Sequence, residues 1–366
     1  MDAAPPTLRI RRWWISLRNR IIASPRFQSH AARNPLLRPV ARQRSARLFD
    51  LVAGFVYTQT LRAVVEAGVL DLLRDGPRST GEIAKSCALD RQPMVRLLRA
   101  AEALQLVEDV GADGWMLGEQ GAALLFNAGA QAMIRHHRLL YDDLSDPLAI
   151  LRADRGQPTR LSHFWAYGAQ SVDAAEYSQL MAQSQEMVAD QVLATGILKQ
   201  VGSLLDVGGG FGVFAGKVLA RYPDQRVGVL DLPEVVASAQ SRVGAERIEW
   251  HPGSFFAEDL PRGYDAISLV RILHDHDDDR ALSILRAARA ALGKGGRLII
   301  AEPMAGVRGA ERMGDAYFGF YLWAMGSGRP RRVGEVHAML REAGFSMLRN
   351  IRTDLPVLTS LIVAHA

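Results

Sequence analysis

The stretch SLLDVGGGFG at residues 203–212 decides the fold. A short apolar run leads into a loop with glycines at a spacing of two, whose candidate ligand-binding residues are Asp206, Gly208, Gly210 and Gly212. Glycine lets the backbone turn sharply and approach a ligand closely, and a helix beginning near Val213 would offer free N–H groups to an anion. A tight strand-to-helix turn without a ligand would use the same glycines, so the surrounding sequence must distinguish the two interpretations.

Short apolar strands and amphipathic helices alternate after Gly202. Strands are predicted at SLLDVG, RVGVLDL, RIEWHPG, YDAISLV and RLIIAEP, with helices at 214–221, 233–242, 278–292 and 332–343. This alternation predicts a mostly parallel sheet with helices on both faces. MLRNIRTD and TSLIVAHA predict two closing strands. Seven strands that end in a hairpin are typical of the Rossmann-like α/β fold of class I methyltransferases rather than of a six-stranded dinucleotide-binding fold.

The loop favours S-adenosyl-L-methionine over NAD as its ligand. A dinucleotide fingerprint needs glycine at its sixth position, where this chain has Val213. Asp231 ends the second strand, where a carboxylate can accept hydrogen bonds from both ribose hydroxyls, although it could instead cap the next helix. Residues after the third strand fall where the adenine would lie, although packing alone could explain the phenylalanine there. The cofactor-binding candidates beyond the loop are Asp231, Leu232, Ser254, Phe255 and Arg271.

A histidine stands at the end of the fourth strand, in ILHDHDDD. Open α/β sheets bind ligands at this edge, so His274 can face the donor methyl and act as a base. Glu302, which ends the fifth strand, can orient His274 through its other ring nitrogen. A structural or capping histidine remains the alternative. We take His274 and Glu302 as catalytic candidates and expect no metal, because no Cys or His cluster has ligand spacing.

Residues 48–195 carry apolar side chains at helical spacing. Within them, Ser79 or Thr80 can cap one short helix, Asp90 can cap a second that ends near Leu104, and LVEDVGADGWML predicts a hairpin. This order is a winged-helix pattern, which also occurs in DNA-binding proteins. The second helix is mostly apolar, which suits a partner chain better than a DNA groove. We expect a homodimer and no nucleic acid.

The basic charge is concentrated at the N-terminus. Residues 1–47 hold eleven Arg, no Lys and one acid, a net charge of +10 that leaves −5 for the rest of the chain. Arginines interleaved with Trp13 and Trp14 indicate an anchor at an anionic membrane surface. A disordered or domain-packing arm and a nucleic-acid contact are the alternatives.

Length and composition predict a soluble protein of about two domains plus this arm. The predicted division is an arm at 1–47, a helical domain at 48–195 and a catalytic domain at 196–366. No uninterrupted apolar run approaches the roughly 18–20 residues of a spanning helix, and no secretory signal is present. The single Cys87 forbids an internal disulfide. We expect a cytoplasmic protein peripherally attached to the inner membrane.

Several motifs together resemble the plant-type O-methyltransferase family, which includes the caffeate and acetylserotonin enzymes. They are LLDVGGGFG, LDLPEVV, RILHDHDDDRALSILR, GGRLIIAEP and REAGF. The resemblance implies S-adenosyl-L-methionine as cofactor, His274 as general base and Glu302 as its support. Two departures are His276, where the plant enzymes usually have tryptophan, and Pro330, where they have a second supporting glutamate. Glu302 alone, or another acid such as Asp275, would then support the base.

Further segments resemble the bacterial carotenoid O-methyltransferases, of the demethylspheroidene or hydroxyneurosporene type. They are NRIIASPRFQ, LFDLVAGFVY, MIRHHRLLYDDLSDPLAIL and HFWAYG. This resemblance implies methyl transfer to the tertiary hydroxyl of an acyclic hydroxycarotenoid. A phenolic or polyketide hydroxyl is the alternative acceptor, and a ligand-sensing DNA-binding regulator is the third hypothesis.

A carotenoid substrate would need an apolar channel. The candidates, each of which could equally be plain core, are Phe164, Trp165, Met181, Phe320, Tyr321, Trp323 and Met325. His136 and His137 are polar candidates near the hydroxyl, although solvated helix positions would explain them as well.

Overall fold

The computed structural model describes residues 6–152, 157–164, 174–241, 245–256 and 259–366. The chain forms two compact units, Met1–Ala122 and Ala123–Ala366. The boundary lies earlier than residue 195 because α11 (Ala174–Ala194) buries Val188, Ala189 and Val192 in a core that it shares with the large sheet.

The first unit holds the arm and the winged-helix pattern. Its elements are α1 (Pro6–Ala23), α2 (Pro25–Arg33), α3 (Arg38–Glu66), α4 (Val69–Leu72), β1 (Arg78–Ser79), α5 (Thr80–Ser86), α6 (Arg91–Ala103), β2 (Val107–Gly111) and β3 (Gly114–Leu117), with α7 (Glu119–Leu125) at its end. The three strands pair antiparallel in the order β1-β3-β2. Ser79 and Glu82 form a capping box on α5, whereas Asp90 stands at the N-cap of α6 without a side-chain capping bond.

Helix α3 runs through the predicted boundary between residues 47 and 48 and is largely exposed. Its exposed large apolar side chains are Val40, Leu48, Phe49, Leu51, Val52, Phe55 and Val56. By length and composition alone it could cross a membrane, and it is the one such helix among the described residues, with 11% of its most apolar window buried. The sequence-based expectation concerned uninterrupted apolar runs, and charges such as Asp50 interrupt the apolar run of α3.

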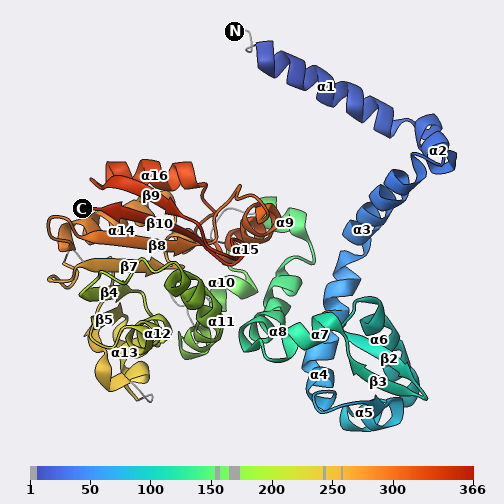
Figure 1. Ribbon diagram of the computed structural model, residues 1–366, viewed down its shortest axis with the longest axis horizontal. Coiled ribbons are helices and arrows are strands. Elements are labelled where there is room, and N and C mark those ends of the chain that lie inside the picture. The colour runs from blue at the N-terminus through green and yellow to red at the C-terminus, as the bar shows by residue number, and fades with distance from the viewer. Residues whose placement is uncertain (1–5, 153–156, 165–173, 242–244, 257–258) are drawn as a thin grey trace. The chain divides into compact units, whose positions relative to one another are not determined.

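The second unit is built on a seven-stranded sheet (Figure 1). The strands are β4 (Ser203–Val207), β5 (Arg226–Asp231), β6 (Glu249–Pro252), β7 (Ala266–Val270), β8 (Arg297–Glu302), β9 (Ser346–Ile351) and β10 (Ser360–His365), in the order β6-β5-β4-β7-β8-β10-β9. The first five pair in parallel, and β10 pairs antiparallel with both β8 and β9. The closing hairpin confirms the predicted class I methyltransferase arrangement.

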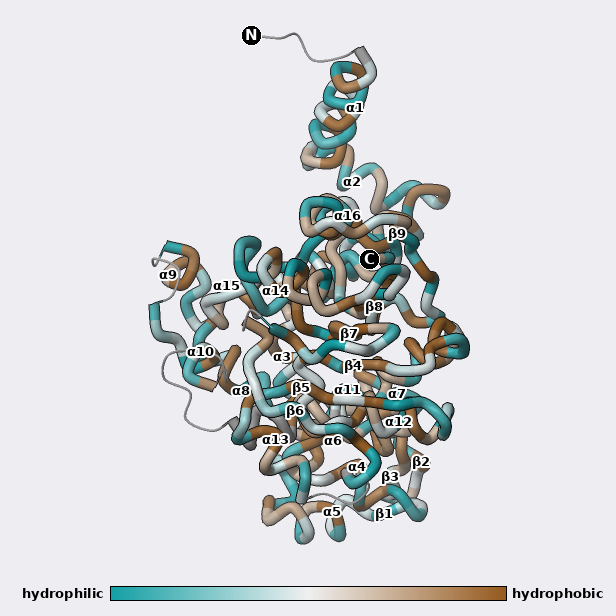
Figure 2. Tube along the Cα trace, turned by 90° about the vertical axis from the view of Figure 1, so that its left-hand side faces the viewer, coloured by the Kyte–Doolittle hydropathy of each residue, from teal (hydrophilic) through white to brown (hydrophobic). Residues whose placement is uncertain are grey.

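Helices cover both faces of this sheet and create two apolar cores. One core joins the strands to α14 (Asp278–Ala291) and α16 (Val333–Glu342), and the other joins them to α11 and α12 (Val213–Arg221). The helix α13 (Pro233–Gln240) and the short turns η1 (Ala245–Arg247) and η2 (Leu273–Asp275) complete the sheet connections. Figure 2 shows the hydrophobic character of the strands, which are buried on both sides.

A further group of helices in the second unit packs around its own small core. These are α8 (Ala128–Asp143), α9 (Pro147–Arg152), α10 (Arg160–Phe164), the π-helix η3 (Arg312–Tyr317) and α15 (Phe318–Met325). Their shared core contains Leu140, Leu161, Tyr321, Leu322, Ala324 and Met325. Single π-turns frequently occur at functional sites, which directs attention to the residues around Tyr317.

Candidate active site

The glycine loop between β4 and α12 has a left-handed backbone at Gly208 (φ 71°), Gly210 (φ 58°) and Gly212 (φ 74°). These values explain the glycines, because other residues adopt this conformation at a cost. A Cβ on Gly208 would also overlap Ile272. Gly208, Gly209, Gly210 and Phe211 of this loop line a cavity of about 60 Å³.

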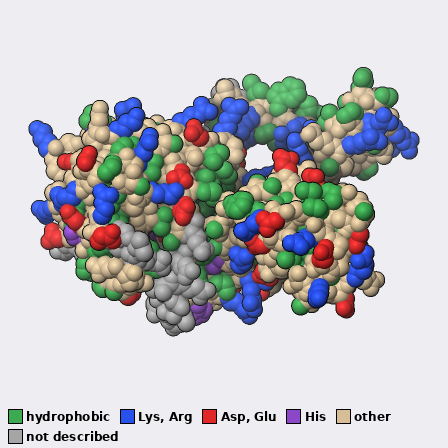
Figure 3. Space-filling model, turned by 60° about the horizontal axis from the view of Figure 1, so that its bottom comes forward, with side chains coloured by type: hydrophobic (Ala, Val, Ile, Leu, Met, Phe, Trp, Pro, Cys, Tyr) green, Lys and Arg blue, Asp and Glu red, His purple; other side chains and the backbone are tan. Residues whose placement is uncertain are grey.

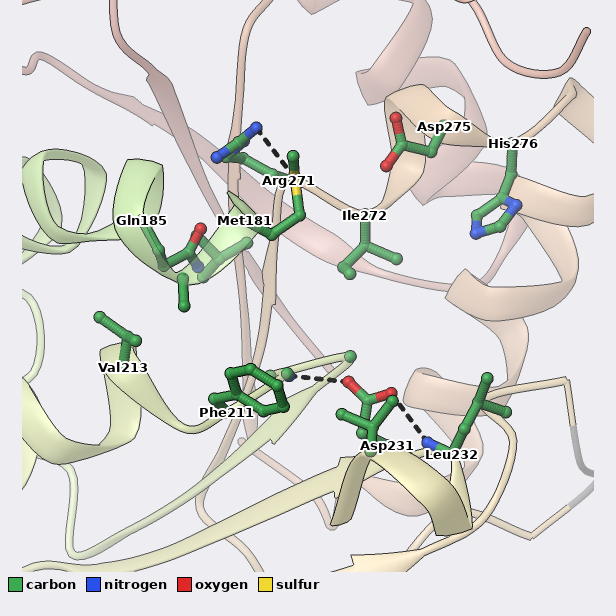
Figure 4. Close-up of a pocket in the computed structure, with 16 residues that line it drawn as sticks. Met181, Gln185, Phe211, Val213, Asp231, Leu232, Arg271, Ile272, Asp275 and His276 are labelled. Carbon is green, nitrogen blue, oxygen red and sulfur yellow. Dashed lines mark hydrogen bonds between the residues drawn. The ribbon is translucent and has the colours of Figure 1, made fainter. Parts of the chain in front are cut away.

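Asp231 joins this loop to the end of β5. Its Oδ2 accepts a hydrogen bond of 2.7 Å from the backbone N–H of Gly210, and its Oδ1 accepts one of 2.8 Å from the N–H of Leu232 (Figure 4). All three residues line the cavity. The carboxylate is therefore held in place at the cavity wall, where it can accept further hydrogen bonds from a diol.

The structure divides the predicted cofactor residues into two groups. Gly208, Gly210, Asp231, Leu232 and Arg271 line the cavity. The others lie outside its lining, namely Asp206, Gly212, Ser254 and Phe255.

The second group supports the cavity from outside. Asp206 is buried beneath the loop, where its Oδ1 accepts a 2.6 Å bond from Ser268 and burial raises its pKa to about 7. Gly212 is the N-cap of α12 and lies against Trp250 and Ile248. The Ser254 hydroxyl accepts a bond from the N–H of Phe256, and the ring of buried Phe255 packs edge-on against His276 at 5.3 Å.

Sequence reasoning did not assign several lining residues to the cofactor site, either because they stand among the more recognisable residues of a motif or because, like Ala182, Gln185 and Val270, they belong to none. These are Ala182, Gln185, Gly209, Phe211, Val213, Val235, Val270, Ile272, Asp275 and His276. His276 has its pKa lowered to about 3, mainly by burial and then by nearby charges such as Arg280. A neutral imidazole packed between Phe255 and Phe256 forms an aromatic wall where the plant enzymes usually have tryptophan.

Arg271, the residue after β7, has an unusual backbone and reaches across the cavity. Its φ is +60°, which is uncommon for a residue other than glycine and is often found at functional sites. Its guanidinium donates to the Ser184 hydroxyl at 2.7 Å and to the Met181 sulfur at 3.4 Å. Met181, predicted to line a substrate channel, therefore lies in the wall of this cavity.

Glu302, at the end of β8, holds the whole turn that carries His274. Its carboxylate accepts backbone N–H bonds from Ile272, Leu273 and His274 at 2.6 to 2.9 Å, and lies 2.7 Å from His274 Nδ1. Burial raises the pKa of Glu302, but His274 and these N–H donors lower it by more. The pKa of Glu302 therefore lies below its usual value. Glu302 is thus ionised and accepts a hydrogen bond from the Nδ1–H of His274.

The other nitrogen of His274 also faces a carboxylate. Nε2 lies 3.1 Å from Oδ1 of Asp275. Burial alone would lower the pKa of His274, but Asp275 and Glu302 outweigh it and the pKa is raised. Burial raises the pKa of Asp275 to about 6, although His274 pulls it down.

Pro330, where the plant enzymes have a second supporting glutamate, offers no carboxylate to His274. Instead the neighbouring Arg331 is buried and donates to the backbone carbonyls of Leu273 and His276, both at 2.6 Å. It also pairs with Asp278 at 2.8 Å. Arg331 therefore holds the backbone of the histidine turn through two carbonyls, whereas Glu302 holds it through three N–H groups.

Comparison with known proteins identifies this arrangement. Residues 141–346, more than half of the chain, match the O-methyltransferase domain family, and residues 49–126 match the O-methyltransferase dimerisation domain. The chain belongs to the O-methyltransferase family. The dimerisation domain supports a homodimer and includes the exposed apolar residues of α3 from Phe49 onward.

Curated relatives and solved structures agree with this assignment. The methyltransferase is 40% identical to demethylspheroidene O-methyltransferases of Rhodobacter capsulatus (94% of this chain, 88% of the relative) and Cereibacter sphaeroides (94% and 93%). It is 30% identical to a 3-amino-4-hydroxybenzoate 4-O-methyltransferase of Streptomyces cremeus (87% and 89%). Its fold resembles that of human N-acetylserotonin methyltransferase in complex with SAM, with a TM-score of 0.76 and 24% identity over 88% of this chain and 97% of that one.

The methyl donor of the enzyme is S-adenosyl-L-methionine, and the residues present fit it. The left-handed glycines leave a cradle that a Cβ at Gly208 would fill, and Asp231 presents a fixed carboxylate for a ribose. Arg271 adds a cation at the cavity wall. The aromatic ring of His276 offers a flat surface to a nucleobase.

His136 and His137, the polar candidates for the acceptor side, each contact a tyrosine hydroxyl. His136 Nε2 lies 3.0 Å from the Tyr321 hydroxyl, and His137 Nε2 lies 2.7 Å from the Tyr317 hydroxyl. Burial lowers the pKa of His136 to about 4 and also lowers that of His137, so both rings are neutral near pH 7. These pairs join α8 to η3 and α15. The ring of Phe318, next in sequence, packs against His274 at 5.5 Å.

The remaining residues predicted to line the substrate channel do not all lie together. The Phe164 ring lies 4.7 Å from that of His136, and Tyr321 and Met325 are buried in the same small core. Phe320 is 37% exposed and is not brought together with them, because helical geometry turns it to the opposite side of α15. The indole of Trp323 donates to the carbonyl of Ile150 and so connects α15 to α9. Trp165 lies outside the described residues.

Proposed function

We propose that this methyltransferase methylates the tertiary hydroxyl of an acyclic hydroxycarotenoid. The observation that carries the proposal is the 40% identity to two demethylspheroidene O-methyltransferases across 94% of the chain. The curated relatives named for benzoate, mitomycin or naphthoate acceptors reach 27% to 30%. The aromatic and aliphatic side chains around Tyr321 and Phe318 offer a surface that suits an apolar acceptor.

The site can perform this transfer by alignment and concerted proton removal. When bound, the cofactor supplies an electrophilic methyl group on a sulfonium. A tertiary alcohol is a far weaker acid than an imidazolium, whose usual pKa is about 6.5, so no side chain here could ionise it beforehand. Deprotonation must therefore accompany formation of the O–C bond. The chain's contribution is to hold the donor through Asp231 and the glycine loop, and to keep proton-accepting groups on the turn 273–276.

An acceptor panel tests this proposal. Purified full-length protein with methyl-labelled donor is assayed against detergent-solubilised hydroxycarotenoids and, in parallel, against phenols and hydroxynaphthoates. We expect turnover of carotenoids with a tertiary hydroxyl and at least 100-fold lower kcat/KM for the phenols. Preferential methylation of a phenol would overturn the carotenoid assignment and establish the alternative acceptor class.

We also propose a role for the N-terminal arm. In this proposal α1 attaches the enzyme to the cytoplasmic face of an anionic membrane. Ile10, Trp13, Trp14, Leu17 and Ile21 recur at helical spacing on α1 and form one apolar stripe. Trp13 and Trp14 are 58% and 60% exposed. The five arginines of α1, at positions 9, 11, 12, 18 and 20, flank this stripe. In Figure 3 basic and hydrophobic side chains lie side by side on the helices at the upper right. A polyene substrate has negligible solubility in water, so attachment would bring the enzyme to it.

Liposome sedimentation tests the arm. Each arginine near an anionic surface contributes about 1 kcal/mol, which together suffices for reversible attachment. Deletion of residues 1–33 removes α1 and α2 and leaves α3 whole, and it should abolish co-sedimentation with anionic vesicles at low salt. The double variant Trp13→Ala, Trp14→Ala keeps the charge and should weaken it several-fold. Equal sedimentation of all three proteins would overturn the proposal and favour a packing role for the arm.

A further inference from the structure

The short helix α2 has an inner and an outer face. Its inner face carries Phe27, which is half-buried, and Ala31, which is 7% exposed. Its outer face carries four exposed polar residues, Arg26, Ser29, His30 and Arg33. Because these four recur at intervals of three and four residues, their side chains lie on one side of the helix.

The outer face lines an open hollow beside the turn from α2 into α3. The residues of this α2 hollow are Pro25, Arg26, Ser29, His30, Arg33 and Asn34. Hydrogen bonds fix the turns at both ends of α2. The Gln28 side chain donates to the carbonyl of Ile22 at 2.9 Å, and Oδ1 of Asn34 accepts the N–H of Leu36 at 2.9 Å. The basic side chains therefore project from a helix whose two ends are held in place.

The α2 hollow is cationic and has no counter-charge of its own. Among the described residues that line it, none is acidic. Residues 3–49 contain no Asp or Glu, so the arm itself has no carboxylate to neutralise Arg26 and Arg33. A guanidinium has five N–H donors and no acceptor, and it can bind a phosphate through two parallel hydrogen bonds. Two such groups, with a hydroxyl and an imidazole on the same helix face, suit a phosphate as ligand.

Apolar side chains on both sides of the α2 hollow indicate that this phosphate belongs to a lipid. Only Ser24 separates α2 from α1, where Trp13 and Trp14 are 58% and 60% exposed. The helix α2 has nine residues and is about 14 Å long, so its basic face stays near that apolar stripe. On the other side Leu36, bonded to Asn34, is 87% exposed. Indoles and a leucine suit the edge of a bilayer, whereas a nucleic acid would leave them in water.

We propose that the α2 hollow binds the phosphate of an anionic lipid headgroup, with Arg26 and Arg33 as its two principal donors. Ser29 and His30 add further donors from the same face. This inference rests on the attachment of α1 to a membrane proposed above. The apolar stripe of α1 alone would leave the enzyme able to turn about its attachment. A headgroup held on α2 adds a second fixed point and so sets the orientation of the arm at the surface.

A substitution that conserves charge distinguishes a phosphate site from general attraction to an anionic surface. Arg26→Lys with Arg33→Lys keeps both positive charges but removes the planar forks that bind two phosphate oxygens. We expect the full-length variant to bind vesicles of phosphatidylcholine and phosphatidylglycerol roughly fivefold more weakly than the parent. Arg42→Lys with Arg44→Lys, at exposed positions of α3, is the matched control and should bind within about twofold of the parent. Equal binding by the parent and the first variant would overturn the site and leave only general attraction.

A soluble lipid tests the α2 hollow without a membrane. Full-length protein with ¹⁵N-labelled histidine is titrated with dihexanoyl phosphatidylglycerol below its micelle concentration, and His30→Gln identifies the His30 signals. These signals should shift with the lipid and should need roughly tenfold more inorganic phosphate for the same shift, because the lipid also covers apolar surface such as Leu36. The shift should be lost in Arg26→Lys with Arg33→Lys.

Three outcomes would overturn the lipid headgroup as ligand. The first is no shift of His30 with the lipid, and the second is saturation by inorganic phosphate at an equal or lower concentration. The third is tighter binding of a DNA duplex that depends on Arg26 and Arg33, which would establish a nucleic-acid contact instead. If the parent binds no vesicles, attachment through α1 fails, while the titration with soluble lipid still decides whether the α2 hollow takes a headgroup.

Discussion

The backbone N–H of Gly210 donates a 2.7 Å hydrogen bond to Oδ2 of Asp231, so the loop after one strand is fixed by the side chain that ends the next. The pairing of β4 with β5 brings them together, because Val207 and Leu230 are in register just before the two ends. The donor cradle is therefore one bonded unit rather than two independent contacts.

Replacing Asp231 should weaken donor binding through this unit. Asp231→Ala removes the acceptor for the ribose and for two backbone N–H groups, a loss of about 1.5–3 kcal/mol, or roughly 10- to 150-fold in Kd. Asp231→Asn keeps one oxygen acceptor and should lose less. Calorimetry with the donor measures both, with exposed Asp224→Ala as control. Donor affinity equal to the parent in Asp231→Ala would remove Asp231 from the site.

Alanine at Gly208 and alanine at Gly216 should have opposite effects on the free energy of unfolding. Gly208→Ala meets a left-handed backbone and the Ile272 side chain, so we expect a loss of about 1–2 kcal/mol in the free energy of unfolding and weaker donor binding. Gly216 lies within α12 with open space around its Cα, and Gly216→Ala should stabilise the enzyme by about 0.5–1 kcal/mol. Urea unfolding compares them, and a loss of stability in Gly216→Ala equal to that in Gly208→Ala would contradict this reading of the loop.

Asp206 should make the enzyme less stable as the pH rises. Burial raises the pKa of Asp206 to about 7, well above its unfolded value, so the folded state holds a proton that the unfolded state releases. This contribution is complete below about pH 4 and is lost as the pH rises through 7. Asp206→Asn lacks this titrating group. The difference in free energy of unfolding between the variant and the parent should therefore shift in favour of the variant by on the order of 2 kcal/mol from pH 5 to pH 8. Parallel pH profiles from denaturant unfolding would contradict the raised pKa.

The pair of His136 and Tyr321 should behave as a coupled unit. Tyr321→Phe leaves the buried His136 nitrogen without its partner, at a cost of about 1–3 kcal/mol, and His136→Phe should cost a similar amount. The double variant should lose less than the sum of the two. Denaturant unfolding of the four proteins gives the coupling energy, with half-buried Tyr141→Phe on α8 as control. Strict additivity would show that the 3.0 Å contact contributes nothing.

The positions of the residues around the donor cavity could be predicted from the sequence, because they follow from the order of the strands along the chain. In a parallel sheet the residue after each strand lies at one edge, so Asp231, His274 and Glu302 could be assigned to that edge from their positions in the chain. The glycine spacing added the loop geometry. The closing hairpin followed from two short apolar runs near the C-terminus.

The remaining features depend on tertiary contacts that no local pattern reveals. Whether Asp275 turns toward Nε2 of His274 depends on the bends of η2, and the support from Arg331 comes from a segment more than fifty residues later. The histidine–tyrosine bonds join α8 to η3 and α15 across 180 residues or more. Phe255 follows β6, as the sequence predicts, but its contact with the ring of His276 could not be read from the sequence.

The two histidine–tyrosine pairs have a consequence for how such an enzyme can diversify. They and the small core around them lie on helices, whereas the donor cradle is made by loops at the strand ends. We therefore expect mutations on α8, α10 and α15 to change acceptor choice while the loops at the strand ends keep their geometry. Relatives named for substrates as different as a carotenoid and an aminohydroxybenzoate are what a lineage would produce when selection acts on the helices and spares the sheet.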